Sequence, residues 1–178
     1  MASEGNQTKS NPMRDVVVDK VTLNIGVGKA GAELENAKTL LERLSGGKAI
    51  ETLAKVRNPV FHIKKGDPIG AKTTLRGPGA IEFVKKALHT KENRLTGKCF
   101  DKRGNFSFGV AEYIEFPGAK YDPQIGIIGF DVCVTLKRRG GWRIKERRRA
   151  GAKIGGSHLL DKEDGVEFAK KTFSVEIA

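Results

Sequence analysis

The chain is 178 residues long and carries 33 lysines and arginines against 21 acidic residues, which gives a formal net charge of +12. A charge surplus of this size favours a polyanionic partner, either nucleic acid or an anionic membrane. Because no apolar run approaches the ~20 residues that span a bilayer, nucleic acid is the better candidate. The two cysteines are too few for a disulfide framework, so a reduced, cytoplasmic environment is expected.

The first part of the chain predicts a tail, a strand and a helix. Residues 1–13 are polar, lack the apolar stretch of a secretory signal, and are expected to form a disordered tail. Residues 14–27 predict a strand, because apolar and polar side chains alternate along them. Leucines at helical spacing predict a helix over residues 31–45. The polar side of the strand carries Lys20, Thr22 and Asn24.

Two further strands and a second helix are predicted next. Residues 50–55 predict a short strand, and residues 56–68, interrupted by prolines and a glycine, predict a loop or a hairpin tip. Residues 69–76 alternate again and predict the third strand, after which Pro78 begins a helix. The polar side of the third strand carries Lys72, Thr74 and Arg76.

The second half of the chain predicts mostly short strands. Residues 90–105 are polar and rich in lysine, so they predict a loop. Apolar, β-branched and aromatic residues predict strands at Phe106–Val110, Tyr113–Phe116 and Ile127–Leu136. Cys133 lies inside the last and most apolar of these strands, and it is expected to be a buried thiol. A final helix is predicted over Asp161–Lys171, because acidic residues lie at its N-terminus, the positive end of the helix dipole.

Strand pairs between helices indicate an α+β fold, with a mostly antiparallel sheet, helices on one face and a basic C-terminal extension. The other face would stay open and carry the polar sides of the first and third strands. Residues 14–178 are expected to form a single RNA-binding domain, because no shift in composition divides them. Threonine, asparagine, lysine and arginine suit contacts to phosphate and sugar, although such residues also form ordinary solvated faces.

Two other stretches are cationic. Residues 55–66 hold no acid, and their candidate contact residues are Lys55, Arg57, His62, Lys64 and Lys65. Residues 137–153, here called the basic segment, hold nine basic residues against one acid and so carry +8 of the net charge. A phosphate backbone would neutralise this cluster, whereas a solvated tail or a nuclear-import signal is the alternative. Its candidate contact residues are Arg138, Arg139, Trp142, Arg143, Lys145, Arg147, Arg148 and Arg149.

An enzyme is the competing class of protein. Gly26, Gly28 and Gly31 match G-x-G-x-x-G after a strand and before a helix, as in dinucleotide-binding proteins. However, the predicted second and third strands follow one another without a helix between them, whereas a dinucleotide fold needs further strand–helix–strand crossovers. The three histidines are far apart in sequence and none lies in a metal-binding motif. We therefore expect a tight turn here, no enzyme activity, no metal and no cofactor.

Four segments resemble the family of large-subunit ribosomal proteins that bacteria call L five and eukaryotes call L eleven. They are KVTLNIGVGKAG at 20–31, GDPIGAKTTLRGPGA at 66–80, GNFSFGVAEYIEFPGAKYDPQIGIIGFDV at 104–132 and GGSHLLDKEDGVEFAKK at 155–171. The basic segment and the GGSH stretch resemble archaeal and eukaryotic members, and the archaeal type is favoured.

The resemblance implies a structural role in the ribosome. Such proteins bind 5S rRNA, attach it to the central protuberance beside other ribosomal proteins, and contact large-subunit rRNA. A loop between the second and third strands reaches the peptidyl-site tRNA, and another surface meets a small-subunit protein at an intersubunit bridge. Asn24, Lys72, Thr74 and Arg76 would then contact 5S rRNA, and residues 55–66 would face the tRNA. A general binder of structured RNA outside the ribosome remains the alternative.

Overall fold

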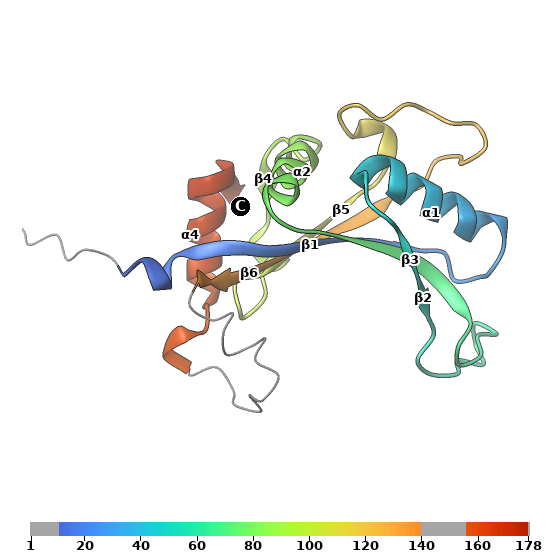
Figure 1. Cartoon of the computed structure of the whole chain (residues 1–178), viewed down its shortest axis with the longest axis horizontal. Coiled ribbons are helices and arrows are strands. Elements are labelled where there is room, and N and C mark those ends of the chain that lie inside the picture. The colour runs from blue at the N-terminus through green and yellow to red at the C-terminus, as the bar shows by residue number, and fades with distance from the viewer. Residues whose placement is uncertain (1–10, 140–155, 178) are drawn as a thin grey trace, which may run out of the picture.

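A five-stranded antiparallel sheet lies at the centre of the computed structural model, which describes residues 11–139 and 156–177 (Figure 1). The strand order is β2-β3-β1-β6-β5, and every neighbouring pair is antiparallel. β1 is the longest strand and lies in the middle, paired with β3 on one side and β6 on the other. The five strands are β1 (Val16–Gly26), β2 (Ile50–Leu53), β3 (Pro68–Leu75), β5 (Phe106–Val110) and β6 (Phe130–Arg138).

Helices and a small second sheet complete the described fold. Two very short strands, β4 (Arg94–Leu95) and β7 (Glu176–Ile177), pair in parallel. The α-helices are α1 (Ala32–Ser45), α2 (Pro78–His89) and α4 (Lys162–Phe173). Single turns of 3-10 helix lie at η1 (Pro12–Arg14), η2 (Gly97–Cys99), η3 (Tyr113–Glu115) and η5 (Gly156–His158). The predicted tail 1–13 lies outside the described residues for its first ten positions.

The apolar core lies between the sheet and the layer formed by α1, α2 and η3, which share one side of the sheet (Figure 1). In β1 the inward side chains are Val21, Leu23 and Ile25, all buried, as strand alternation requires. α1 adds leucines at helical spacing and α2 adds Phe83 and Val84. The predicted α+β class, the antiparallel sheet and the helices on one face are confirmed.

The segment Tyr113–Phe116 was predicted as a strand, and this prediction is wrong. The Phe116 amide donates to the Tyr113 carbonyl at 3.0 Å, which closes a 3-10 turn. Tyr113 and Phe116 are both buried, and a spacing of three residues puts them on one side of a 3-10 turn but on opposite sides of a strand. The Phe116 ring stacks on Phe83 of α2 at 4.8 Å, so tertiary packing selects the turn.

The boundaries of other elements also differ from the sequence prediction. β6 begins at Phe130 rather than at Ile127, whose side chain is exposed. β4 and β7 were not predicted, because a two-residue strand is too short to show alternation. The predicted loop 90–105 therefore contains β4 and η2. β4 and β7 pair because the end of the chain returns to the region after α2.

α4 packs against the end of the sheet through an unusually close backbone contact. A Cβ atom added at Gly165 in α4 would lie 2.5 Å from the Gly104 Cα atom and would overlap the Gly104 carbonyl oxygen. Gly104 has φ +71, a conformation that glycine adopts at little cost. Beside this contact the Phe173 ring of α4 meets the edge of Phe106 at 6.3 Å. Glycine at 165 thus sets how closely α4 approaches the sheet.

We predict that Gly165→Ala destabilises the protein by about 1–3 kcal/mol, because the added methyl group has no space and the overlap is with backbone. Urea unfolding followed by circular dichroism measures this effect. The matched control is Gly79→Ala in α2, where an added Cβ meets nothing within 4 Å. There the change should be neutral or stabilising by up to about 1 kcal/mol. Equal stability of the two variants would contradict the close contact.

Candidate nucleic-acid interface

The side of the sheet away from α1 and α2 carries polar side chains in rows that cross the strands. In one row Asn24 of β1 lies opposite Lys72 of β3 and Asp131 of β6. In the next row Thr22 lies opposite Thr74 and Cys133, and Cys133 lies opposite Ser107 of β5. Directly opposite side chains lie about 5 Å apart on the same side, so these rows form one continuous surface. We call it the open face.

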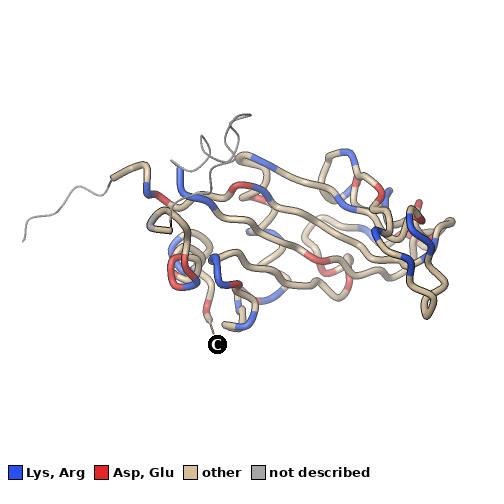
Figure 2. The backbone as a smooth tube through the Cα atoms, turned by 90° about the horizontal axis from the view of Figure 1, so that it is seen from below, with Lys and Arg blue, Asp and Glu red and all other residues tan. Residues whose placement is uncertain are grey.

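The structure brings all six candidate residues of β1 and β3 to the open face or its edge. Lys72, Thr74 and Arg76 are exposed, and their partners on β1 are half-buried between neighbouring strands. No helix within residues 11–139 and 156–177 covers this surface, which Figure 2 views from below. The residues on β1 are Lys20, Thr22 and Asn24. Within the part of the chain that the structure describes, the exposed cations and the hydroxyl groups between them are therefore accessible.

Two carboxylates interrupt the positive charge of the open face. Asp131 is exposed in the same row as Asn24. Asp19 lies at a register shift in β1 between Val18 and Lys20, and its side chain is only 6% exposed. Its Oδ1 atom lies 2.6 Å from Lys137 Nζ and 3.8 Å from Arg76 Nη1. Burial of a carboxylate is costly unless cations are paired with it, and Lys137 and Arg76 are the cations paired with Asp19.

Sequence reasoning missed the contribution of β6 and β5 to this surface. Cys133, expected in the core, is only half-buried and lies in the middle of the open face. Burial raises the pKa of the Cys133 thiol, and the Asp131 carboxylate raises this pKa further. Cys133, Thr135 and Lys137 alternate with buried Val132, Val134 and Leu136. This alternation was present in the sequence and could have identified the outward residues.

The hairpin tip, residues 54–67, projects from the end of β2 and β3 (Figures 1 and 2). An antiparallel bridge between Asn58 and Ile63 closes it, with the Asn58 amide donating to the Ile63 carbonyl at 2.9 Å. His62 adopts φ 55 at the turn, in the left-handed region that residues other than glycine seldom occupy. The five candidate residues of the tip are all exposed, namely Lys55, Arg57, His62, Lys64 and Lys65.

Apolar side chains at the hairpin tip are a second feature that sequence reasoning missed. Val56, Val60 and Phe61 are 76%, 80% and 68% exposed. Exposed apolar side chains gathered on a projecting loop typically mark a contact surface. The signal in the sequence was a set of apolar residues within a loop that fits neither strand nor helix periodicity. The tip therefore offers both cations and apolar surface to a partner.

The structure describes only the start of the basic segment. Arg138 is held against α4 by Asp164, with Nη2 at 2.7 Å from Oδ2, and its side chain is only 15% exposed. Arg139 is exposed, and its backbone amide donates to the Asp15 carbonyl at 3.1 Å. The other candidates lie outside the described residues, namely Trp142, Arg143, Lys145, Arg147, Arg148 and Arg149. Their contact with RNA stays a prediction.

The glycine-rich turn after β1 does not have the features of a dinucleotide site. The amides of Val27 and Gly28 donate to the Ile69 carbonyl at 2.9 and 2.8 Å, so they are not directed at a phosphate. The sheet is antiparallel, whereas a dinucleotide fold has parallel strands with crossover helices. Gly28 and Gly31 both have positive φ and allow the chain to turn into α1. The tight-turn interpretation accounts for these glycines.

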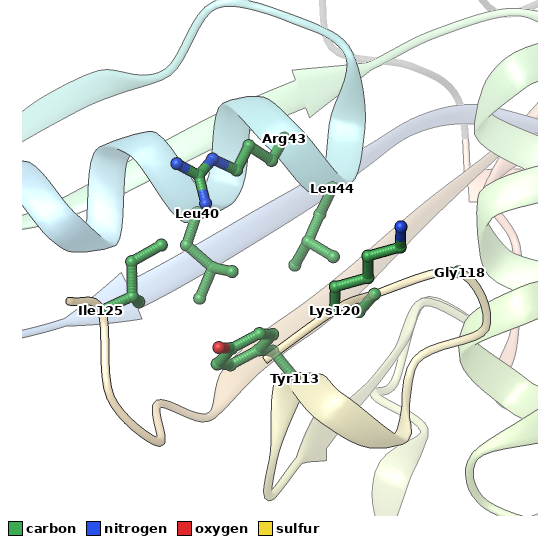
Figure 3. Close-up of a pocket in the computed structure, with 8 residues that line it drawn as sticks. Leu40, Arg43, Leu44, Tyr113, Gly118, Lys120 and Ile125 are labelled. Carbon is green, nitrogen blue, oxygen red and sulfur yellow. The ribbon is translucent and has the colours of Figure 1, made fainter. Parts of the chain in front are cut away.

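The hollow beside α1 is not equipped for catalysis. It has a volume of about 310 Å³ and lies between α1 and the loop after η3 (Figure 3), lined by apolar side chains together with Arg43, Tyr113 and Lys120. Its lining has no carboxylate, histidine, serine or cysteine, and Arg43 is ion-paired to Asp122 at 2.6 Å. Across residues 11–139 and 156–177, no three histidines, cysteines or acids gather as metal ligands would. In the same ranges no helix combines the length and apolar character needed to cross a membrane.

Comparison with known proteins defines the class as a ribosomal protein rather than an enzyme. The family model described as Ribosomal protein L5 matches residues 11–64, and the model of the C-terminus of the same ribosomal family matches residues 68–168. The chain belongs to the ribosomal protein L5 family.

Archaeal relatives match nearly the whole chain, and each is named large ribosomal subunit protein uL5. The protein of Thermoplasma acidophilum is 49% identical over 168 residues, which cover 94% of this chain and 98% of the relative. That of Archaeoglobus fulgidus is 52% identical over 158 residues, 89% of this chain and 88% of the relative. That of Sulfurisphaera tokodaii is 48% identical and covers 94% of both chains. The expected family is confirmed, and the similarity to archaeal members agrees with the expected type.

We predict that alkylation of Cys133 responds to pH differently in the folded and the unfolded chain. The thiolate is the reactive form, and the raised pKa of the folded thiol reduces the thiolate fraction at neutral pH. In a Cys99→Ser variant, the iodoacetamide reaction should therefore rise at higher pH in buffer than in urea. Quenched time points read by mass spectrometry measure the rate. Identical pH midpoints in buffer and in urea would contradict the burial of this thiol.

Proposed function

We propose that this structural constituent of the large ribosomal subunit binds 5S rRNA with its open face and helps attach it to the central protuberance. The observation that carries the proposal is that β1 and β3 direct their polar residues to a surface without a covering helix in the described structure. An antiparallel sheet that buried both faces would need apolar residues on both. A polar face that no helix of the described structure packs against, and on which cations outnumber carboxylates, suits a polyanion.

The chemistry of the open face suits a folded RNA. Lysine and arginine neutralise phosphates, and threonine and asparagine side chains donate to and accept from ribose hydroxyl groups. Lys72 and Thr74 are exposed on β3 and Arg76 is exposed directly after its end, so charged and hydroxyl side chains alternate along residues 72–76. Shape and 2′-hydroxyl contacts dominate the recognition of double-stranded RNA by proteins. The open face would therefore lie along a helical groove rather than enclose a single base.

The hairpin tip would contact the peptidyl-site tRNA. Support comes from its projection beyond the sheet, its four exposed lysines and arginines, and its exposed Phe61. Cations would approach the tRNA backbone, while an aromatic ring could stack on an unpaired base. The bridge between Asn58 and Ile63 holds the tip as a hairpin, which reduces the ordering cost of binding.

The remaining partners follow from the family resemblance. The basic segment would contact large-subunit rRNA, where nine basic residues replace condensed counterions along phosphates. Other central-protuberance proteins and a small-subunit protein at an intersubunit bridge would meet further surfaces, for which no residue is proposed. Residues 14–178 would act as one rRNA-binding domain. Arg138 would have to exchange its Asp164 partner, or share it, to reach RNA.

We predict that Arg76→Ala weakens binding to 5S rRNA about tenfold, or about 1.4 kcal/mol, because it removes an exposed guanidinium from the open face. Filter-binding titrations at fixed salt measure the dissociation constant. The matched control is Arg94→Ala, which removes the same charge from β4 in the separate two-stranded sheet. Equal affinities for the two variants would count against the open face as the binding surface.

The same titration separates the ribosomal function from its alternative. An unrelated structured RNA of similar length should bind more weakly than 5S rRNA at moderate salt. If both RNAs bound equally, general binding of structured RNA outside the ribosome would be favoured instead.

We predict that bound 5S rRNA protects Cys133 from alkylation. The thiol lies in the row between Thr22 and Ser107, so RNA on the open face would cover it. With RNA at a hundredfold excess over Kd, about 1% of sites stay free, and the rate in the Cys99→Ser variant should fall at least about tenfold. In the reciprocal Cys133→Ser variant, Cys99 packs against the core side and should react at an unchanged rate. Alkylation of Cys133 at the free rate would refute this placement.

A further inference from the structure

The carboxylate of Asp19 lies between two cations at the border of the open face, Arg76 and Lys137. Asp19 is the extra residue at the register shift in β1, where Val18 pairs with Leu136 and Lys20 pairs with Thr135. Bulges of this kind redirect a side chain and are common next to functional sites. The Asp19 carboxylate contacts Lys137, which begins the basic segment, and Arg76, which directly follows β3.

The carboxylate of Asp19 is buried, with Lys137 Nζ at 2.6 Å, within hydrogen-bond distance, and Arg76 Nη1 at 3.8 Å as a longer ion pair. Its side chain is 6% exposed, whereas Arg76 is 61% exposed and Lys137 28% exposed. The acid is thus shielded from solvent while the cations it holds remain accessible. A guanidinium has five N–H donors, so contact with one carboxylate oxygen leaves others directed outward. A phosphate could bind these remaining donors without displacing Asp19.

Without Asp19, the side chains of Arg76 and Lys137 would be less ordered. Their positive charges would also repel each other more strongly. Lysine and arginine side chains lose considerable rotamer entropy when they are ordered, and binding that must order them is weaker. Two positive groups close together also repel, and an acid between them lowers that repulsion. Asp19 therefore reduces the net positive charge of the open face, but it orders the side chains of Arg76 and Lys137 before a ligand binds.

We propose that Asp19 is a positioning residue for RNA binding, which holds Arg76 and Lys137 in the arrangement that meets adjacent phosphates. This inference rests on the proposed binding of 5S rRNA and goes beyond it, because Asp19 itself would not touch the RNA. The proposal also predicts an effect on affinity that is opposite to the one expected from net charge. Removal of a negative charge from a protein that binds a polyanion should weaken the complex rather than strengthen it.

The test compares the full-length protein with its Asp19→Asn variant in filter-binding titrations of 5S rRNA over a range of salt concentrations. The variant gains one unit of net positive charge, so a count of charges predicts tighter binding. Positioning predicts the opposite, a weakening of about fivefold or more, because Arg76 and Lys137 must be ordered during binding. The salt dependence should also become shallower, by about 0.7–0.9 in slope for each phosphate that the variant no longer binds. If the substitution only lowered the folding stability of a variant that still folds, the slope of affinity against salt concentration would stay unchanged.

Two further variants sharpen the comparison. Glu112→Gln removes an exposed acid next to η3, on the helix side of the sheet, and should bind as well as the wild type or better. Lys137→Met should weaken binding in the wild type and weaken it less in the Asp19→Asn background, because the two residues act as one unit.

The outcomes are distinguishable. If wild-type protein does not bind 5S rRNA, the proposed function fails. If wild-type protein binds and Asp19→Asn binds equally or more tightly with the same salt slope, only the positioning role of Asp19 is overturned. Circular dichroism verifies folding, and Asp19→Ser provides the same charge change in a smaller side chain if the Asn variant is unfolded.

Discussion

The alternation of β1 is the constraint on which the rest of the structure depends. β1 is the central strand, so its two sides define the two surfaces of the whole sheet. One side carries Val21, Leu23 and Ile25 and requires the cover that α1 and α2 supply. The other side carries Thr22 and Asn24, and β3, β6 and β5 continue it with polar or small residues. A shift of one residue in pairing would exchange the two surfaces and expose the core.

Acidic residues organise the positive charge at the border of this sheet. Asp19 contacts both Arg76 and Lys137, and Asp164 at the start of α4 holds Arg138. Asp19 is only 6% exposed, and the cost of burying its carboxylate is offset only while its cations stay in place. In a protein whose net charge is +12, these acids are paired with cations that would otherwise repel one another. The net charge favours a polyanionic partner, whereas the ion pairs with these acids show where three of the cations lie.

The hairpin tip illustrates a different use of the same sheet. The residues that join β2 and β3 are mostly exposed, and Ala54 is the one buried residue among positions 54–67. Val60 and Phe61 are exposed in a small hairpin that the bridge between Asn58 and Ile63 closes. Chain that projects from a rigid sheet can reach a partner that the sheet itself does not touch. The open face and the tip are therefore two separate surfaces, and each is proposed above to contact RNA.

The sequence alone determined the elements whose side-chain pattern is long and local. Alternation in β1 and β3 and leucine spacing in α1 were sufficient for the fold class and for six residues of the open face. Tertiary structure decided the features that depend on contacts between residues distant in sequence. It made Tyr113–Phe116 a 3-10 turn through the stack of Phe116 on Phe83, and it brought Asp19 to both Arg76 and Lys137. These contacts join residues dozens of positions apart, so their free energy appears only after the strands have paired.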